Sequence, residues 1–286
     1  MAKDMVRKVA LDQEIAQKYA KFLVEKNLSD SPTARQDFCQ TAAVHPKLLY
    51  YNPHIKALES LFSDRSNVER LMDMTVREWT LYHHHYVHQA YRYGDKEMQQ
   101  RWLNHDILKS PFDCWVYQEL IYKIKPDYII ELGIMFGGAT HFYASICDLA
   151  GHGEVIGIDI SLAKVKSVDN SRITLIEGSS SSQETFDKVK EIVGDKTVLV
   201  IADSDHEKNH CLAELRLFSQ LVTVGSYYVV EDSLNDVMHW HPVPNEGPQA
   251  AAIAFAEETD DFVFDTRYAE KYIFSLSPLG FLLRVK

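Results

Sequence analysis

Hydrophobic residues in the C-terminal two thirds of the chain occur in short runs, separated by stretches that are long enough to form helices. Runs of four to six apolar residues, as found here, are typical of strands buried on both faces of a sheet. Their alternation with helices predicts a parallel α/β sheet with crossover helices. The predicted strands are 128–132, 155–160, 173–176, 198–202 and 227–230, and the predicted helices are 139–150, 182–193 and 207–222.

The pattern changes near the C-terminus, where the apolar segments 262–268, 272–277 and 281–285 follow one another without a helix between them. The sequence SPLG at 277–280 is typical of a turn. We therefore expect an antiparallel hairpin at one edge of the sheet. A mostly parallel, Rossmann-like sheet that ends in such a hairpin resembles the layout of the class I S-adenosylmethionine-dependent methyltransferases.

The N-terminal region follows a different pattern. Apolar residues such as Ile15, Tyr19 and Phe22 recur at helical spacing. No long flexible linker separates this region from the rest of the chain. We expect a helical extension over residues 1–110, packed on a methyltransferase domain of residues 111–286 or on a partner subunit.

The amino-acid composition argues against nucleic acid and membranes as binding partners. The formal net charge is −11, and the basic residues form no concentrated patch, which argues against binding to nucleic acid. No apolar run reaches the roughly 18 residues of a membrane span, and the N-terminus lacks the apolar core of a signal peptide. The four cysteines contain no CxxC pair and indicate reduced thiols. We expect a soluble, cytoplasmic protein without a membrane partner.

Ligands of open α/β sheets bind beyond the carboxyl ends of the strands, so the polar residues at those positions are candidates for a site. The first strand ends in Glu131 and Gly133, followed by Gly137, and glycine allows a tight turn and a close approach of the backbone to a ligand. An ordinary strand-to-helix turn explains these glycines equally well. Their G-x-x-x-G-G spacing does not match the dinucleotide-binding motif, which counts against NAD or FAD.

The next two strands end in further candidates for cofactor binding. Asp159 follows the second strand, where its carboxylate could accept hydrogen bonds from both ribose hydroxyls, although such a residue is often only a helix cap. Gly178, Ser179 and Ser180 follow the third strand and could border an adenine ring; alternatively, they form a loop that caps the next helix.

Acidic residues dominate the ends of the last two parallel strands. The fourth strand ends at Asp203 and continues to His206, and the fifth ends at Glu231 and Asp232. Clustered carboxylates repel one another and are stabilised by a cation. Oxygen ligands suit Mg²⁺, Mn²⁺ or Ca²⁺ rather than zinc. Solvated acidic loops that happen to be neighbours remain the structural alternative.

This spacing resembles the metal-dependent O-methyltransferases of the catechol type. Over about half the chain, the sequence resembles more closely the cephalosporin hydroxylase-like family, which includes metal-dependent sugar O-methyltransferases of macrolide biosynthesis. The matching segments are KSP (109–111), WVYQEL (115–120), KPDYIIELGIMFGG (125–138), VIGIDI (155–160), EGSS (177–180), ADSDH (202–206) and GSYYVVED (225–232).

The resemblance implies S-adenosylmethionine and Mg²⁺, or another divalent cation such as Mn²⁺, as cofactors. It implies that Asp203, Glu231 and Asp232 hold the metal, with Asp205 behind them, and that Asp203 also borders the cofactor. His206 would be the general base, which removes a proton from a metal-bound hydroxyl. The resemblance further implies a homo-oligomer.

We therefore predict metal-dependent methylation of a hydroxyl on a specialised metabolite, namely a sugar, a polyketide or a peptide product. Two alternatives remain open: an oxygenation or methoxylation enzyme of the same family, and a non-catalytic partner protein with the methyltransferase fold.

Two further segments have weaker functional signals. The tract Tyr82–His88 contains four histidines but lacks a metal motif, so a packed or solvated aromatic face explains it better. The Pro- and Gly-containing segment 235–251 is a candidate substrate lid in which Trp240 and His241 would contact the acceptor, or an ordinary connector.

Overall fold

The computed structural model describes residues 18, 21–22, 24–27, 100–237, 246–272 and 275–286. The chain divides into the units Met1–Met74 and Thr75–Lys286. In the first unit, residues 18, 21, 22 and 24–26 are helical, in agreement with the predicted spacing. The histidine tract at 82–88 and the lid candidates Trp240 and His241 lie outside the described residues, and the domain boundary at residue 110 stays a prediction.

A seven-stranded sheet with the order β5-β4-β3-β6-β7-β9-β8 forms the centre of the second unit. Strands β3 to β7 are parallel, and β9 pairs antiparallel with both β7 and β8. The chain order reverses beside β3, where the loops after neighbouring strands diverge and leave a crevice. The strands are β3 (Tyr128–Leu132), β4 (Glu154–Asp159), β5 (Ile173–Glu177), β6 (Val198–Ala202), β7 (Tyr227–Val230), β8 (Phe262–Phe264) and β9 (Phe281–Arg284).

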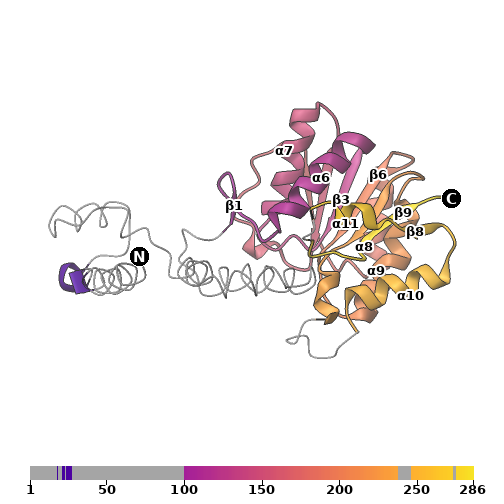
Figure 1. The fold of residues 1–286 in the computed structure, drawn as a ribbon. Coiled ribbons are helices and arrows are strands. Elements are labelled where there is room, and N and C mark those ends of the chain that lie inside the picture. The colour runs from indigo at the N-terminus through magenta and orange to yellow at the C-terminus, as the bar shows by residue number, and fades with distance from the viewer. Residues whose placement is uncertain (1–17, 19–20, 23, 28–99, 238–245, 273–274) are drawn as a thin grey trace. The chain divides into compact units, whose positions relative to one another are not determined.

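Helices cover both faces of the sheet (Figure 1). Successive residues of a strand point to opposite faces, and each face therefore has its own hydrophobic core. One core joins the sheet to α6 (Pro111–Ile124), α7 (Gly138–Ala150) and α11 (Thr266–Glu270). The other joins it to α8 (Gln183–Val193), α9 (Lys208–Phe218) and α10 (Pro248–Glu258). This unit also contains the 3₁₀ helices η3 (Leu162–Lys164), η4 (Ser219–Leu221) and η5 (Ser233–Val237).

The predicted fold class, with its parallel strands, crossover helices and antiparallel C-terminal edge, is confirmed. The expectation that no helix separates the last apolar segments is wrong, because α11 follows β8. Asp265 caps this helix by accepting a hydrogen bond from the Arg267 backbone N–H at 3.3 Å. Its carboxylate also accepts from the Tyr227 hydroxyl at 2.8 Å, which anchors the start of α11 to β7. Within the described ranges, no helix combines the length and the apolar character needed to cross a bilayer.

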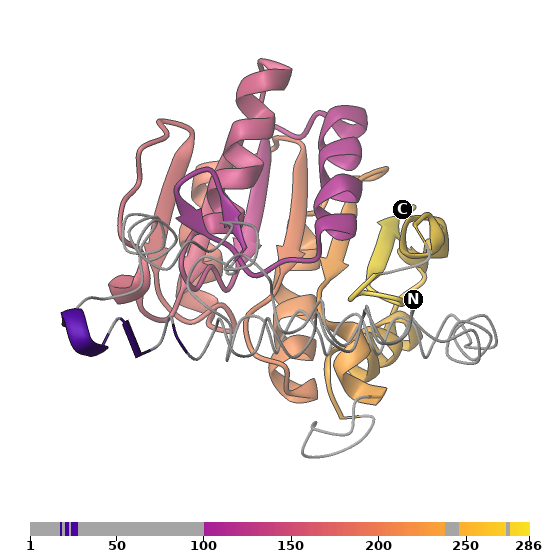
Figure 2. The same cartoon turned by 60° about the vertical axis from the view of Figure 1, so that its left-hand side comes forward.

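A short hairpin, β1 (Arg101–Trp102) with β2 (His105–Asp106), lies against α7 (Figure 2). The Trp102 ring packs edge-on against Phe142 at 4.9 Å, and its indole N–H donates to the Ser145 hydroxyl at 3.0 Å. A methyl group at Gly138 would overlap the Asp106 carbonyl, so the close approach of hairpin and helix requires glycine. The hairpin thereby fixes the segment that leads to Lys109.

The turn before β9 is equally close-packed. A methyl group on Gly280 would overlap the Val230 carbonyl oxygen, whereas Gly225 has open space around it and a left-handed φ of +85°. We expect Gly280→Ala to cost about 3 kcal/mol through steric overlap and Gly225→Ala about 1 kcal/mol through backbone strain. Chemical denaturation of both variants checks this order, and equal destabilisation would contradict it.

Candidate active site

A cavity of about 640 Å³ lies at the carboxyl edge of the sheet. Its volume is typical of a site for a small-molecule ligand. The loops after five successive parallel strands contribute to its lining, as the sequence pattern predicts. The sequence-predicted residues that line it are Glu131, Gly133, Asp159, Ser179, Ser180, Asp203, His206 and Asp232, with Asp205 beside them.

Gly133 marks the point where the ends of β3 and β6 meet. Its φ is +82°, and a methyl group there would overlap the backbone of Asp203 and Ser204. The Asp203 N–H in turn donates to the Leu132 carbonyl at 2.7 Å. Glycine is therefore required at this position to bring the loop that contains Asp203 against the loop that follows β3.

Asp159 organises the loop after β3 while facing the cavity. One carboxylate oxygen accepts from the backbone N–H groups of Ile134 and Met135 at 3.0 and 2.9 Å. The other accepts from the Ser161 N–H at 3.1 Å. The two backbone contacts use both lone pairs of Oδ2, whereas Oδ1 has a second lone-pair direction with which it can still accept a hydrogen bond from a ligand.

Glu131 and the serine loop border the cavity on either side of Asp159. Burial raises the pKa of Glu131 to about 7, and Thr140 donates to its carboxylate at 2.5 Å. The Ser180 hydroxyl lies 3.3 Å from the His210 ring nitrogen Nε2. Ser182 caps α8, so part of the serine run serves the helix rather than the cavity.

Three sequence-predicted residues, Gly137, Gly178 and Glu231, do not line this cavity. Gly137 caps α7 with a φ of +79°. A methyl group on Gly178 would lie 2.6 Å from the Thr185 hydroxyl, so this glycine allows the β5 loop to close on α8. Binding roles for these residues stay predictions.

Asp203, His206 and Asp232 converge at one end of the cavity. The His206 Nε2 atom lies 3.5 Å from Asp203 Oδ1 and 3.4 Å from Asp232 Oδ2. One potential ligand atom from each residue lies within 4.8 Å of the others, an arrangement that can hold a metal ion. Asp232 has a left-handed φ of 51°, which turns its backbone away from β7 immediately after Glu231.

Lys109 is the feature of the site that the sequence did not predict. Its buried ammonium group donates to Asp203 Oδ2 at 2.6 Å and also to Glu231. Burial lowers the pKa of Lys109, but the two carboxylates outweigh this effect and hold the pKa well above its usual value. Glu231 is thereby kept behind the cavity lining, bound to a cation supplied by the protein.

The acidic residues differ in their electrostatics. Burial and repulsion from Asp203 raise the pKa values of Glu231 and Asp232. Burial also disfavours ionised Asp203, but Lys109 and His206 prevail and lower its pKa. Protons on carboxyl groups that lie this close together are the ones a divalent cation would displace, so the donor set fits such an ion.

The charge on His206 depends on the same carboxylates. Burial lowers its pKa, but the hydrogen bond to Asp203 and the charge of Asp232 outweigh burial and raise the pKa to about 9. The Asn235 side-chain amide lies 3.2 Å from the other ring nitrogen, Nδ1, and fixes the plane of the imidazole. Neutralisation of the carboxylates by a cation would remove the interactions that retain the proton on this ring.

A second group of potential ligands, His105, His141 and Asp169, lies beside the hairpin. Both ring Nε2 atoms approach Asp169 Oδ1, at 3.2 and 3.1 Å. The two rings are stacked, however, with centroids 3.5 Å apart and planes 13° apart. Lone pairs in two nearly parallel planes do not converge on one ion, so we interpret this group as a stacked pair that binds a carboxylate.

We predict that Lys109→Met lowers the free energy of unfolding by about 3–5 kcal/mol, because it leaves Glu231 buried without its cation. Urea denaturation of the metal-free protein measures this change. The double variant with Glu231→Gln should regain much of the loss, since it removes the unpaired carboxylate. If the double variant instead lost the sum of the free energies that the two single variants lose, Lys109 and Glu231 would not interact.

We predict that the His206 imidazole of the metal-free protein titrates near pH 9 instead of near its ordinary value of 6.5. The proton contributes its full stabilisation below pH 6.5, and this contribution is lost as the pH rises to about 9. NMR of ¹³C-labelled histidine, assigned with His206→Asn, measures the titration. Addition of Mg²⁺ should lower the pKa; titration near 6.5 without metal would contradict the prediction.

Comparison with known proteins places the chain in a family. The family described as rhamnosyl O-methyltransferase/CmcI matches residues 95–285. A rhamnosyl O-methyltransferase from Mycobacterium leprae is 32% identical over 191 residues, which cover 64% of this chain and 82% of that protein. The Mycobacterium tuberculosis protein of the same name is 31% identical over 194 residues, which cover 62% of this chain and 74% of that protein.

Solved structures agree on the fold. A CmcI structure without ligand superposes with a TM-score of 0.55 at 24% identity, covering 68% of this chain and 80% of that one. A CmcI structure with Mg and S-adenosylmethionine gives a TM-score of 0.53 over the same shares. The S-adenosylmethionine-dependent O-methyltransferase predicted from the sequence is confirmed at the level of the family: this chain belongs to the rhamnosyl O-methyltransferase/CmcI family.

Proposed function

We propose that this protein transfers a methyl group from S-adenosylmethionine to a hydroxyl of a sugar, in a reaction that uses a divalent cation such as Mg²⁺. One observation supports this most directly: a single cavity is lined by Asp159 at one end and by Asp203, His206 and Asp232 at the other. Relatives named rhamnosyl O-methyltransferases favour a deoxysugar of a specialised metabolite as the acceptor.

The residues around Asp159 would bind the cofactor. Asp159 would accept a hydrogen bond from the ribose hydroxyls at Oδ1, while Oδ2 holds the loop after β3 through its backbone contacts. Ser179 and Ser180 would border the adenine ring, and Glu131 would face the amino-acid end of the cofactor. Glu131 suits that position because its carboxyl group lies in the cavity lining close to Gly133.

Asp203 and Asp232 would hold the cation from the cavity, and Glu231 would either join them or remain with Lys109. A bound divalent cation supplies positive charge that lowers the pKa of an acceptor hydroxyl and fixes its position. The protein residues would then align that hydroxyl with the sulfonium methyl group. Such alignment contributes a large share of the acceleration in a methyl transfer.

His206 would accept the hydroxyl proton through Nε2. This role requires the tautomer that carries its hydrogen on Nδ1, with the Asn235 amide turned so that its oxygen accepts that hydrogen. As the oxygen forms its bond to the methyl carbon, the carbon–sulfur bond breaks and its electron pair stays on sulfur. S-adenosylhomocysteine leaves as the neutral product, and the proton remains on His206 until solvent removes it. A neutral imidazole is required for this role, and the carboxylates must therefore be neutralised first.

The proposal extends to the cellular compartment, the acceptor and the biosynthetic context of the reaction. The described cysteines, Cys114, Cys147 and Cys211, are free thiols, in keeping with a reducing cytoplasmic compartment. A small hydroxylated acceptor is the expected partner, and antibiotic or related natural-product biosynthesis the expected context. A homo-oligomer remains part of the proposal through family resemblance.

The function is tested by calorimetric titration of S-adenosylhomocysteine into the chelator-treated protein, repeated with Mg²⁺. We expect micromolar binding that Asp159→Ala abolishes, because the variant loses both the ribose acceptor and the loop contacts. Asp159→Asn should bind with intermediate affinity, and Asp169→Ala, an exposed aspartate outside the cavity, should bind like the wild type. Absence of binding to the wild type would refute the proposal.

Methyl transfer is then measured with p-nitrophenyl α-L-rhamnoside and S-adenosylmethionine in the presence of Mg²⁺. His206→Ala should lower the rate about a hundredfold or more through loss of the base, with the affinity for S-adenosylhomocysteine retained. A wild type that binds the cofactor but methylates no glycoside would contradict the sugar acceptor alone.

A further inference from the structure

Helix α9 carries a buried glutamate, Glu214, among the core residues Cys211, Leu215 and Phe218. Only 1% of its surface is exposed. A carboxylate at this depth is unfavourable unless polar groups satisfy it with hydrogen bonds. Glu214 is connected to two loops of the cavity, directly to the loop after β6 and through His210 of α9 to the loop after β5.

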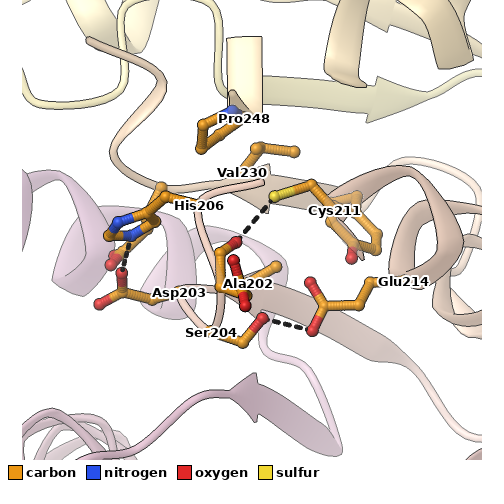
Figure 3. Close-up of a pocket in the computed structure, with 11 residues that line it drawn as sticks. Ala202, Asp203, Ser204, His206, Cys211, Glu214, Val230 and Pro248 are labelled. Atoms are coloured by element: carbon orange, nitrogen blue, oxygen red, sulfur yellow. Dashed lines mark hydrogen bonds and ion pairs between the residues drawn. The ribbon is translucent and has the colours of Figure 1, made fainter. Parts of the chain in front are cut away.

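The first of these is the catalytic loop, residues 203–206. The Ser204 hydroxyl donates to Glu214 Oε1 at 2.5 Å, and the Cys211 thiol donates to the Asp205 carbonyl at 2.9 Å. Figure 3 shows Asp203 and His206 on one side of this loop and Glu214 with Cys211 on the other. A small cavity of about 10 Å³ lies between the catalytic loop, α9 and the end of β7.

The second is the serine loop after β5. The His210 Nε2 atom lies 3.2 Å from Glu214 Oε1 and 3.3 Å from the Ser180 hydroxyl. The hydrogen bond to Glu214 raises the pKa of His210 and favours the imidazolium, whose Nε2–H is a donor. Ser180 and His210 both line the large cavity, at the end assigned above to the adenosyl group.

One carboxylate oxygen of Glu214 therefore connects the cofactor end of the cavity with the loop that contains Asp203 and His206. We propose that Glu214 is a positioning residue that couples occupation of the adenosyl end of the cavity to the placement of the catalytic loop. A ligand that orders Ser180 and His210 also orders Glu214 and Ser204. A cation that binds afterwards finds the catalytic loop already ordered and loses less conformational entropy on binding. The two ligands therefore bind with positive cooperativity.

This inference rests on the proposed function, and the experiment below distinguishes a failure of the coupling from a failure of that function. The affinity for Mn²⁺ is measured by electron paramagnetic resonance with and without saturating S-adenosylhomocysteine. The affinity for S-adenosylhomocysteine is measured by calorimetry with and without Mn²⁺. Linkage requires both experiments to give the same coupling factor, and we expect about tenfold for the wild type.

Glu214→Gln keeps the size of the side chain but loses the charge that holds His210, so the coupling factor should fall below about twofold. If Glu214→Gln folds poorly, His210→Gln tests the same connection by removing the other partner. We expect its coupling factor to fall below about twofold as well. The control is Glu258→Gln, which removes an exposed glutamate that pairs with Arg216 of α9. It should retain the wild-type factor.

A merely structural Glu214 would lower the melting temperature of Glu214→Gln and leave the coupling factor unchanged, and that result would overturn the inference. A wild type that binds both ligands without cooperativity would overturn it as well. A wild type that does not bind S-adenosylhomocysteine would refute the proposed function, and the coupling inference with it.

Discussion

The structure around the cavity depends on how the negative charge at the carboxyl ends of β6 and β7 is stabilised. Asp203, Glu231 and Asp232 lie in two adjacent loops. Asp203 and Asp232 face the cavity, Glu231 is buried, and the buried ammonium group of Lys109 contacts Asp203 and Glu231. Lys109 reaches them from the segment between the hairpin and α6. The close packing of the hairpin on α7 is therefore part of the same electrostatic arrangement as the acids.

Much of this architecture could be predicted because it follows from local pattern. Short apolar runs specify buried parallel strands, and parallel strands bring their carboxyl ends to one edge. Lys109 could not be found in this way, since its partners lie 94 and 122 positions further along the chain. Glu214 gave one signal, a charged residue at a core position of a helix, but its partners are visible only in three dimensions. The cap at Asp265 shows how a single polar residue turned an expected strand into α11.

Glu231 and Asp232, which follow β7, show why the sequence could assign two residues to one site without predicting their different surroundings. Glu231 and Asp232 are neighbours just after β7, but the left-handed φ of 51° at Asp232 turns the chain away from the strand direction between them. Asp232 faces the cavity, whereas Glu231 faces Lys109 in the interior. Two adjacent acids therefore have different partners and different surroundings.

The position of β9 affects how the protein can be made. It follows the other six strands of this sheet in chain order, yet it lies between β7 and β8. During synthesis on the ribosome, the outer edge of β7 stays without a neighbour until residues 281–284 emerge. β7, the strand that leads into the acidic site, is therefore paired on both sides only after the other strands of the sheet have been synthesised. A nascent chain cut short before β9 would expose an unpaired strand edge, a known starting point for aggregation.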